Sequence, residues 1–163
     1  TTRDRLPKPS FAAVQQALVA LFALPGIPCI TYGTEAGLTL SRQNMFDEKH
    51  YDQAAPQAAF LRKLIELRKQ NPTLSRGDCA VERTSPGCGL LAYSMTYRHE
   101  TCLTVFNTAP DAMFYELPGD FAAQEVLLSS EGRTTAPRSL ALAPESFLML
   151  KGARKPPAEL PAS

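Results

Sequence analysis

The sequence predicts a mixed fold, with an α/β part over residues 1–74 and an antiparallel β-sandwich over residues 75–152. Two helical segments flank a short apolar run in the first part. From residue 78 onward, short runs of β-favouring residues alternate with turns that contain proline or glycine. The proline-rich tail over residues 153–163 is expected to be flexible.

Residues 11–24, FAAVQQALVALFAL, have the composition of a buried helix. Only Gln15 and Gln16 are polar, so a helix here presents apolar side chains on nearly every face. Ser10 is of a residue type that caps helix N-termini, and Pro25-Gly26 ends the helical pattern.

A short strand is predicted over residues 28–32, because apolar residues follow one another there without alternation. Such strands are covered on both faces, as in parallel sheets. A helix, a two-residue connection and a buried strand form the αβ unit of an α/β fold. The polar stretch over residues 33–55 is longer than an ordinary connection, and loops of this length usually carry function or are disordered.

The second helix is predicted to begin at Pro56 and to end at Asn71-Pro72. Its charged residues, Arg68 among them, are expected mostly to face water. Its apolar stripe comprises Phe60, Leu61, Leu64, Ile65 and Leu67.

The second part of the chain offers six or seven short strands separated by turns. Their regular spacing predicts an antiparallel sandwich. The runs are CAVERT, GLLAYSMTY, TCLTVFN, MFYELP, AQEVLLS, SLALA and SFLMLK.

The α/β part is not expected to stand alone. One parallel strand with two helices has no sheet to join, and its apolar faces would be open to water. We therefore expect the chain to be the C-terminal portion of a larger protein, with the missing N-terminal portion as its partner.

Composition narrows the range of other partners. The net charge of +1 predicts neither a nucleic-acid nor a membrane partner. The longest apolar run is interrupted by Pro25, Gly26 and Pro28, so no bilayer-spanning segment is expected. No signal peptide is visible in the polar N-terminal residues, and the compartment stays open.

The cysteines are predicted to be buried free thiols. Their spacing with the histidines does not match a zinc site, because the sequence contains no Cys-x2-Cys pair. The expected hairpin register argues against a disulfide between Cys79 and Cys88. The other two cysteines are Cys29 and Cys102.

The stretch GIPCITYGTE carries a resemblance to a known family. It is similar to the segment at the eighth barrel strand of α-amylase family enzymes (glycoside hydrolase family 13). The order of the segments after it is also similar: a long loop with an arginine, a helix reading LIELRKQNPTLSRG, and a sandwich that the family calls domain C. The matching positions of the stretch are Gly26, Pro28, Tyr32, Gly33 and Glu35.

The resemblance implies that residues 1–74 are the C-terminal part of a (β/α)8 TIM barrel, whose sites lie at the C-terminal ends of the strands. It also implies retaining hydrolysis or transfer at α-glucosidic bonds of an α-glucan or α-glucoside substrate. The family's two aspartates and its glutamate sit on strands four, five and seven, which are not in this chain. We therefore expect no catalytic residue here, and an inactive chain on its own.

Carboxylates in or beside the long loop are not expected to replace those acids. Glu35, Asp47, Glu48 and Asp52 show no spacing that predicts two carboxyl groups facing each other across a sugar. Loop acids near Arg42 and Lys49 are more often solvated or salt-bridged.

Three residues are candidates for the rim of the site. Tyr32 ends the predicted strand, where an aromatic residue could bind sugar or simply fill the barrel. Glu35 begins the loop and is expected to orient neighbouring side chains. Arg42 is the better candidate for substrate binding, since relatives place an arginine near this position and its fork of donors suits adjacent hydroxyls; an ordinary surface arginine is the alternative.

Two other functions stay open. The chain could belong to a non-catalytic relative of the α-amylases, or it could be a stand-alone carbohydrate-binding sandwich. The absence of tryptophan disfavours the second, because starch-binding modules use flat aromatic platforms. No cofactor is expected in this chain, and calcium is possible in the full-length protein.

Overall fold

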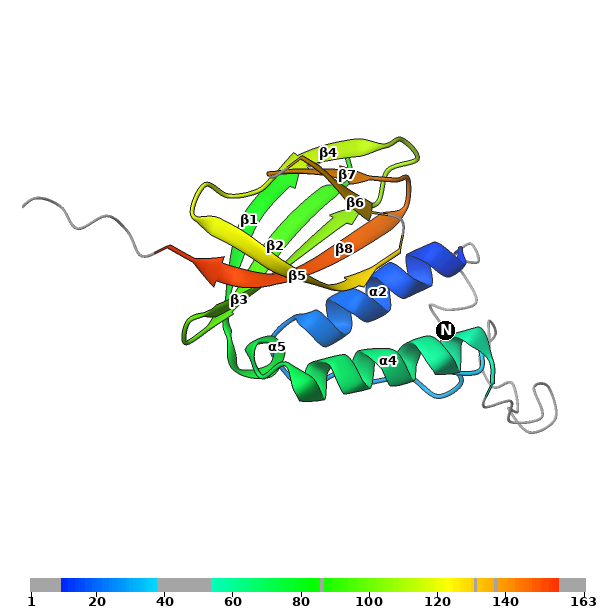
Figure 1. Cartoon of the computed structure of the whole chain (residues 1–163). Helices are drawn as coiled ribbons and strands as arrows, with labels where there is room; N and C mark the ends of the chain where they lie inside the picture. The colour runs from blue at the N-terminus through cyan, green and yellow to red at the C-terminus, as the bar shows by residue number, and fades with distance from the viewer. Residues whose placement is uncertain (1–9, 38–53, 86, 131, 137, 156–163) are drawn as a thin grey trace, which may run out of the picture. The chain divides into compact units, whose positions relative to one another are not determined.

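The computed structural model describes residues 10–37, 54–85, 87–130, 132–136 and 138–155. The chain divides into two compact units, Thr1–Ser75 and Arg76–Ser163. Among the described residues, the regular elements of the first unit are helices, and the second unit is built mainly of strands (Figure 1). Most of the tail predicted to be flexible lies outside the described residues.

The first predicted helix is confirmed as α2, Phe11–Ala23. The Ser10 hydroxyl accepts a hydrogen bond from the Ala13 N–H at 3.0 Å, which satisfies one of the free donors at the helix start. The helix ends at Leu24, and Gly26 follows with a φ of 106°, a conformation that favours glycine.

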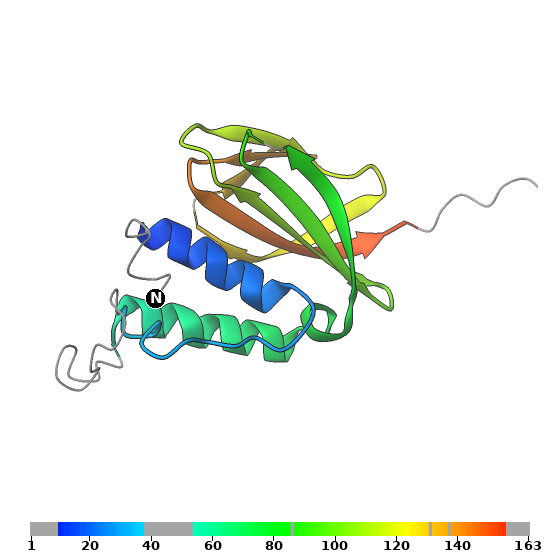
Figure 2. The ribbon, with the colours of Figure 1, turned by 180° about the vertical axis from the view of Figure 1, so that it is seen from behind.

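The second predicted helix is confirmed as α4, Pro56–Gln70, and is followed by the short α5, Thr73–Arg76. The Asn71 side chain donates to the Leu67 carbonyl at 2.8 Å and satisfies an acceptor at the end of α4. α2 and α4 run in the same direction, and the chain after α2 returns along them (Figures 1 and 2).

The predicted strand over residues 28–32 is not formed. These residues have no regular secondary structure, and the Tyr32 side chain is 56% exposed. A strand is stabilised by hydrogen bonds to neighbouring strands. Both sheets of the described structure consist of strands from residue 78 onward, so this segment has no strand to pair with.

The described residues of the second unit form eight strands, and every pairing found between them is antiparallel. They form a five-stranded sheet in the order β1-β2-β3-β8-β5 and a three-stranded sheet in the order β4-β7-β6 (Figure 2). The strands are β1 Asp78–Ser85, β2 Leu90–Tyr97, β3 Glu100–Asn107, β4 Met113–Glu116, β5 Phe121–Ser129, β6 Gly132–Ala136, β7 Ser139–Leu142 and β8 Ser146–Arg154.

The predicted β-sandwich is confirmed, and each of the seven predicted runs falls on a strand. β6 was not predicted, because the run Gly-Arg-Thr-Thr-Ala carries little apolar signal and begins at a glycine that is typical of a turn. The sandwich core draws side chains from both sheets: Ala92, Leu103, Val105, Tyr115, Leu117, Phe121, Leu140, Leu142, Leu148 and Leu150.

All four cysteines are free, as predicted, but their predicted burial is wrong for three of them. Cys102 lies on β3, the middle strand of the larger sheet, and is buried; burial raises the pKa of its thiol to about 12. Cys79 is exposed because β1 is an edge strand, and Cys88 lies in the turn after it. Cys29 is exposed in the segment that forms no strand.

Candidate functional site

The candidate site lies on residues 24–37, here called the rim segment. Its C-terminal half consists of two successive turns. The Thr34 N–H donates to the Thr31 carbonyl at 3.1 Å, and the Gly37 N–H donates to the Thr34 carbonyl at 3.2 Å. Gly33 and Gly37 have φ values of 83° and 67°, which other residues adopt at a cost.

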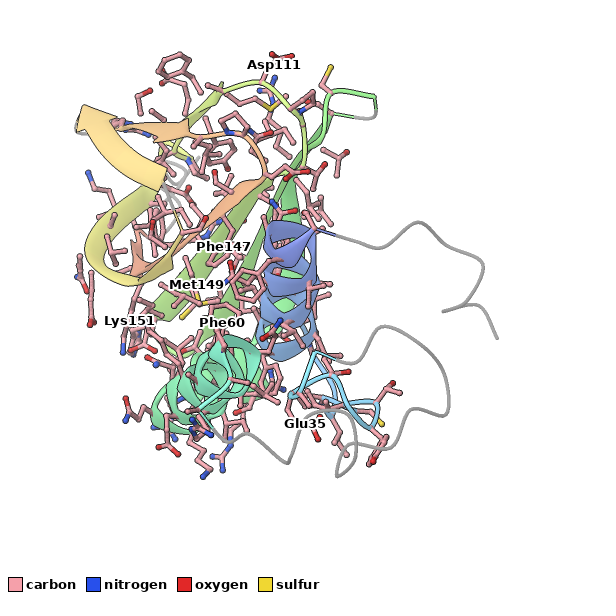
Figure 3. The ribbon with its side chains drawn as sticks, turned by 90° about the vertical axis from the view of Figure 1, so that its right-hand side faces the viewer. Glu35, Phe60, Asp111, Phe147, Met149 and Lys151 are labelled. Carbon is pink, nitrogen blue, oxygen red and sulfur yellow. The ribbon has the colours of Figure 1, made fainter. Side chains whose placement is uncertain are left out.

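The two turns bring two of the predicted site residues onto one short stretch. Tyr32 is exposed and Glu35 is half-buried, three residues further on. Figure 3 labels Glu35 on this stretch, on the part of the chain that follows α2. Arg42, the third candidate, lies outside the described residues.

The rim segment approaches the start of α4. A Cβ atom added at Gly37 would lie 3.0 Å from Nε2 of Gln57, in the first turn of that helix. The end of the rim segment is therefore held close to α4, and a larger side chain at this position would have to displace Gln57.

The helical pattern predicts that Arg68 faces water from α4, and this prediction is wrong. Its guanidinium instead donates to backbone carbonyls around the end of α2. Nη1 donates to the carbonyls of Phe22, of Leu24 at 3.1 Å and of Leu74 at 2.7 Å. Nη2 donates to the Gly26 carbonyl at 2.7 Å.

These contacts replace water around the guanidinium, and the partial burial lowers the pKa of Arg68. The sequence held one weak signal for this role. α2 has no basic residue in its last turn, so the negative end of its dipole lacks a cation of its own. The partner comes from a helix more than forty residues away, and no local pattern identifies it.

The rim segment can supply hydrogen bonds, but it cannot supply a pair of acids. Its titratable side chains are the Cys29 thiol, the Tyr32 phenol and a single carboxylate, that of Glu35. Retaining glycoside chemistry uses two carboxyl groups about 5–5.5 Å apart. Within the described ranges, no group of three or more His, Cys, Asp or Glu side chains could hold a metal ion.

The chain is similar in sequence to known proteins. The chain is 30% identical over 119 residues to a maltogenic α-amylase of Bacillus acidopullulyticus, covering 69% of this chain and 20% of that protein. It is 31% identical over 111 residues to a cyclomaltodextrinase of Geobacillus thermopakistaniensis, covering 63% of this chain and 18% of that protein. No family model matches the chain.

A solved structure supports the fold. The debranching enzyme of Nostoc punctiforme superposes with a TM-score of 0.73 at 22% identity, over 86% of this chain and 31% of that one. The resemblance seen in the sequence is confirmed: the chain is a relative of the C-terminal portion of α-amylase family enzymes. It spans about a fifth of the length of the curated relatives that it matches.

Among the described residues, none of the helices is long and apolar enough to cross a bilayer.

Proposed function

We propose that this chain is the C-terminal part of a retaining α-glucoside hydrolase or transglycosylase whose catalytic acids lie on residues outside it. The similarity to the maltogenic α-amylase carries the proposal, together with the order of rim segment, α4 and sandwich. On this proposal the substrate is an α-glucan or α-glucoside, and residues 1–163 alone are inactive.

The exposure of the rim segment supports a missing barrel portion. Ile27 is 94% exposed and Tyr32 is 56% exposed, although apolar side chains of this size are usually covered. The backbone of residues 28–32 also lacks strand partners in the described structure. Neighbouring barrel strands would cover these side chains and would pair with this backbone.

Within the proposed enzyme, the rim segment and the loop after it contact the sugar but do not attack it. Tyr32 binds substrate through its hydroxyl and ring. Arg42 binds sugar hydroxyls through its guanidinium. Glu35 orients its neighbours at the rim, because no second carboxylate on the rim segment could complete a catalytic pair.

No cofactor is needed for this chemistry, since two carboxyl groups suffice for retaining hydrolysis. If the complete protein binds calcium, we propose that the ligands come from outside the rim segment. The rim segment offers only one carboxylate, and calcium takes six to eight oxygen ligands.

The test is an assay of the complete gene product on maltooligosaccharides, starch, cyclodextrin and sucrose, with NMR detection of the anomer first formed. We expect cleavage or transfer at α-glucosidic bonds with retention of the α-anomer. The 163-residue chain, assayed in parallel, is expected to show none. Absence of activity in a folded complete product that lacks the three upstream acids would favour a non-catalytic relative.

Arg42→Ala tests the binding role, with Arg62→Ala on the exposed face of α4 as its matched control. We expect Arg42→Ala to raise KM for long substrates while the control leaves it unchanged. Equal KM values for Arg42→Ala and the wild type on long and short substrates would refute this role.

A further inference from the structure

α2 ends without the usual means of satisfying its last carbonyls. The final turn of a helix leaves several carbonyl groups without partners inside the helix. α2 has no basic residue in that turn, and its cap residue Leu24 donates its own N–H to the Ala20 carbonyl. The remaining acceptors need a donor from elsewhere in the fold.

Arg68 supplies that donor from α4 and reaches beyond the helix end. One guanidinium accounts for the carbonyls of Phe22 and Leu24, and also for that of Gly26, where the chain turns with positive φ. Its positive charge lies at the negative end of the α2 dipole, where a cation is stabilising. Arg68 thus holds both the end of α2 and the first bend of the rim segment.

The same side chain anchors this bend to the far end of α4. Nη1 also donates to the Leu74 carbonyl in α5, at 2.7 Å. The planar fork of arginine presents two nitrogens with separate directions, one toward Leu74 and one toward Gly26. A lysine ammonium carries its charge at a single point and could not hold both acceptors with the same geometry.

We propose that Arg68 is a positioning residue for the rim segment. By fixing the direction in which the chain leaves α2, it sets where the turns with Tyr32 and Glu35 lie relative to a bound sugar. The substrate part of this inference rests on the proposed function. The positioning part rests on the hydrogen bonds alone.

The positioning part is tested by amide hydrogen exchange in the complete gene product. Arg68→Gln is expected to speed exchange about tenfold or more at the Leu24, Thr34 and Gly37 amides, because local opening of the rim segment becomes easier. Arg68→Lys is expected to give an intermediate increase. Lys63→Gln, an exposed position on the same helix, is the matched control and should leave exchange unchanged.

Exchange at the Leu64 amide inside α4, in the same unit as the rim segment, separates local from global effects. Unchanged exchange at Leu24, Thr34 and Gly37 in Arg68→Gln would overturn the proposal. An equal rise at Leu64 would also overturn it, because the arginine would then stabilise the whole first unit rather than the rim segment. Arg68→Lys keeps the charge and serves where Arg68→Gln fails to fold.

The substrate part is tested on the same variants with maltooligosaccharides. Arg68→Gln is expected to raise KM on the order of tenfold with little change in kcat, since misplaced binding groups weaken substrate positioning. Faster exchange with an unchanged KM would overturn this part. If the wild type has no activity on any α-glucoside, the proposed function fails, and exchange alone still decides whether Arg68 positions the rim segment.

Discussion

At the scale of single residues, Arg154 organises a charged cluster in the second unit. Its Nη1 donates to Oδ2 of Asp120 at 2.8 Å, and its Nη2 donates to the Glu82 carboxylate. The Ser94 hydroxyl donates to the same Glu82 oxygen. The cluster joins β1, β2 and β8 to the turn before β5. The hydrogen bond from Arg154 lowers the pKa of Asp120.

This cluster predicts a dependence of stability on pH. Because the pKa of Asp120 is lowered on folding, the unfolded chain binds its proton at a higher pH than the native protein does. Asp120 therefore contributes fully to the free energy of unfolding above its unfolded pKa of about 3.9. This contribution is lost as the pH falls through the lower pKa that Asp120 has in the native protein. In urea unfolding across pH 2–7, the free energy of unfolding should fall less steeply toward acid pH for Asp120→Asn than for the wild type.

Glu116→Gln is the matched control, because Glu116 is an exposed acid on β4 of the same unit. Its pH profile should stay close to that of the wild type. An Asp120→Asn profile parallel to the wild-type profile would show that the Arg154 contact does not couple to folding.

Asn107 at the end of β3 is a second residue on which stability depends. It is fully buried, and its Nδ2 donates to the carbonyls of Asp111 at 2.7 Å and Ala143 at 2.9 Å. Its Oδ1 accepts from the Ala109 N–H at 2.9 Å. Asn107→Ala leaves these groups without partners and should lower the free energy of unfolding by about 1–3 kcal/mol. Denaturant unfolding measures the change.

Gln124→Ala, at an exposed position on β5, is the control for this experiment and should change stability little. A loss for Asn107→Ala no larger than that of the control would mean that water replaces the lost hydrogen bonds.

At the scale of elements, the pairing of β5 with β8 depends on Gly152. A Cβ atom at this position would lie 2.1 Å from the Ala122 carbonyl oxygen and 3.0 Å from the Phe121 ring. Backbone cannot yield as a flexible side chain can, so Gly152→Ala must push the two strands apart. We expect a loss of about 3 kcal/mol or more, seen as a lowered Tm.

Gly119→Ala provides the matched comparison. Its added Cβ would lie 3.4 Å from the Arg138 guanidinium, the far end of a long side chain that can shift. This variant should melt close to the wild type. Similar Tm values for Gly152→Ala and the wild type would mean that β5 can move outward at little cost.

The elements that the sequence predicts well are those with local signals. Both helices carry start and stop residues and are confirmed: Ser10 precedes α2 and Pro56 is the first residue of α4, while Pro25 and Pro72 follow the two helices. The prediction of a strand over residues 28–32 was wrong because a strand depends on partners outside its own sequence. β6 was missed because polar residues in a short strand do not reveal the period of two.

At the scale of the whole molecule, the second unit has the features of an independently folding body. Its core cluster comes entirely from its own strands and from Leu117, in the connection between β4 and β5. We expect residues 76–155, expressed alone, to unfold in one cooperative thermal transition followed by circular dichroism. Leu103→Ala truncates a core side chain that is 1% exposed, and it should lower the midpoint temperature of that transition strongly.

A broad, non-cooperative transition for residues 76–155 would show that the sandwich needs residues 1–75 to fold. A cooperative transition that Leu103→Ala leaves unmoved would show that the cluster is not the core of the folded unit.

The candidate site was only partly accessible to sequence reasoning. Tyr32 and Glu35 were predicted from a recognisable stretch and stay predictions, and the two turns place them close together in the chain. Arg68 was missed because its acceptors are carbonyls of Phe22, Leu24 and Gly26, and carbonyls are the same in every residue type. Side-chain chemistry leaves a trace in the sequence, whereas the position of a backbone acceptor appears only in the fold.

The strand order of the larger sheet also bears on how the protein is made. β8 lies between β3 and β5, so the sheet stays in two pieces until residues 146–154 have left the ribosome. During that interval β3 and β5 present unpaired edges, which are sites of aggregation in nascent chains. Pairing β3 with β8 then closes a loop of about forty residues, and such long-range pairings form more slowly than local hairpins.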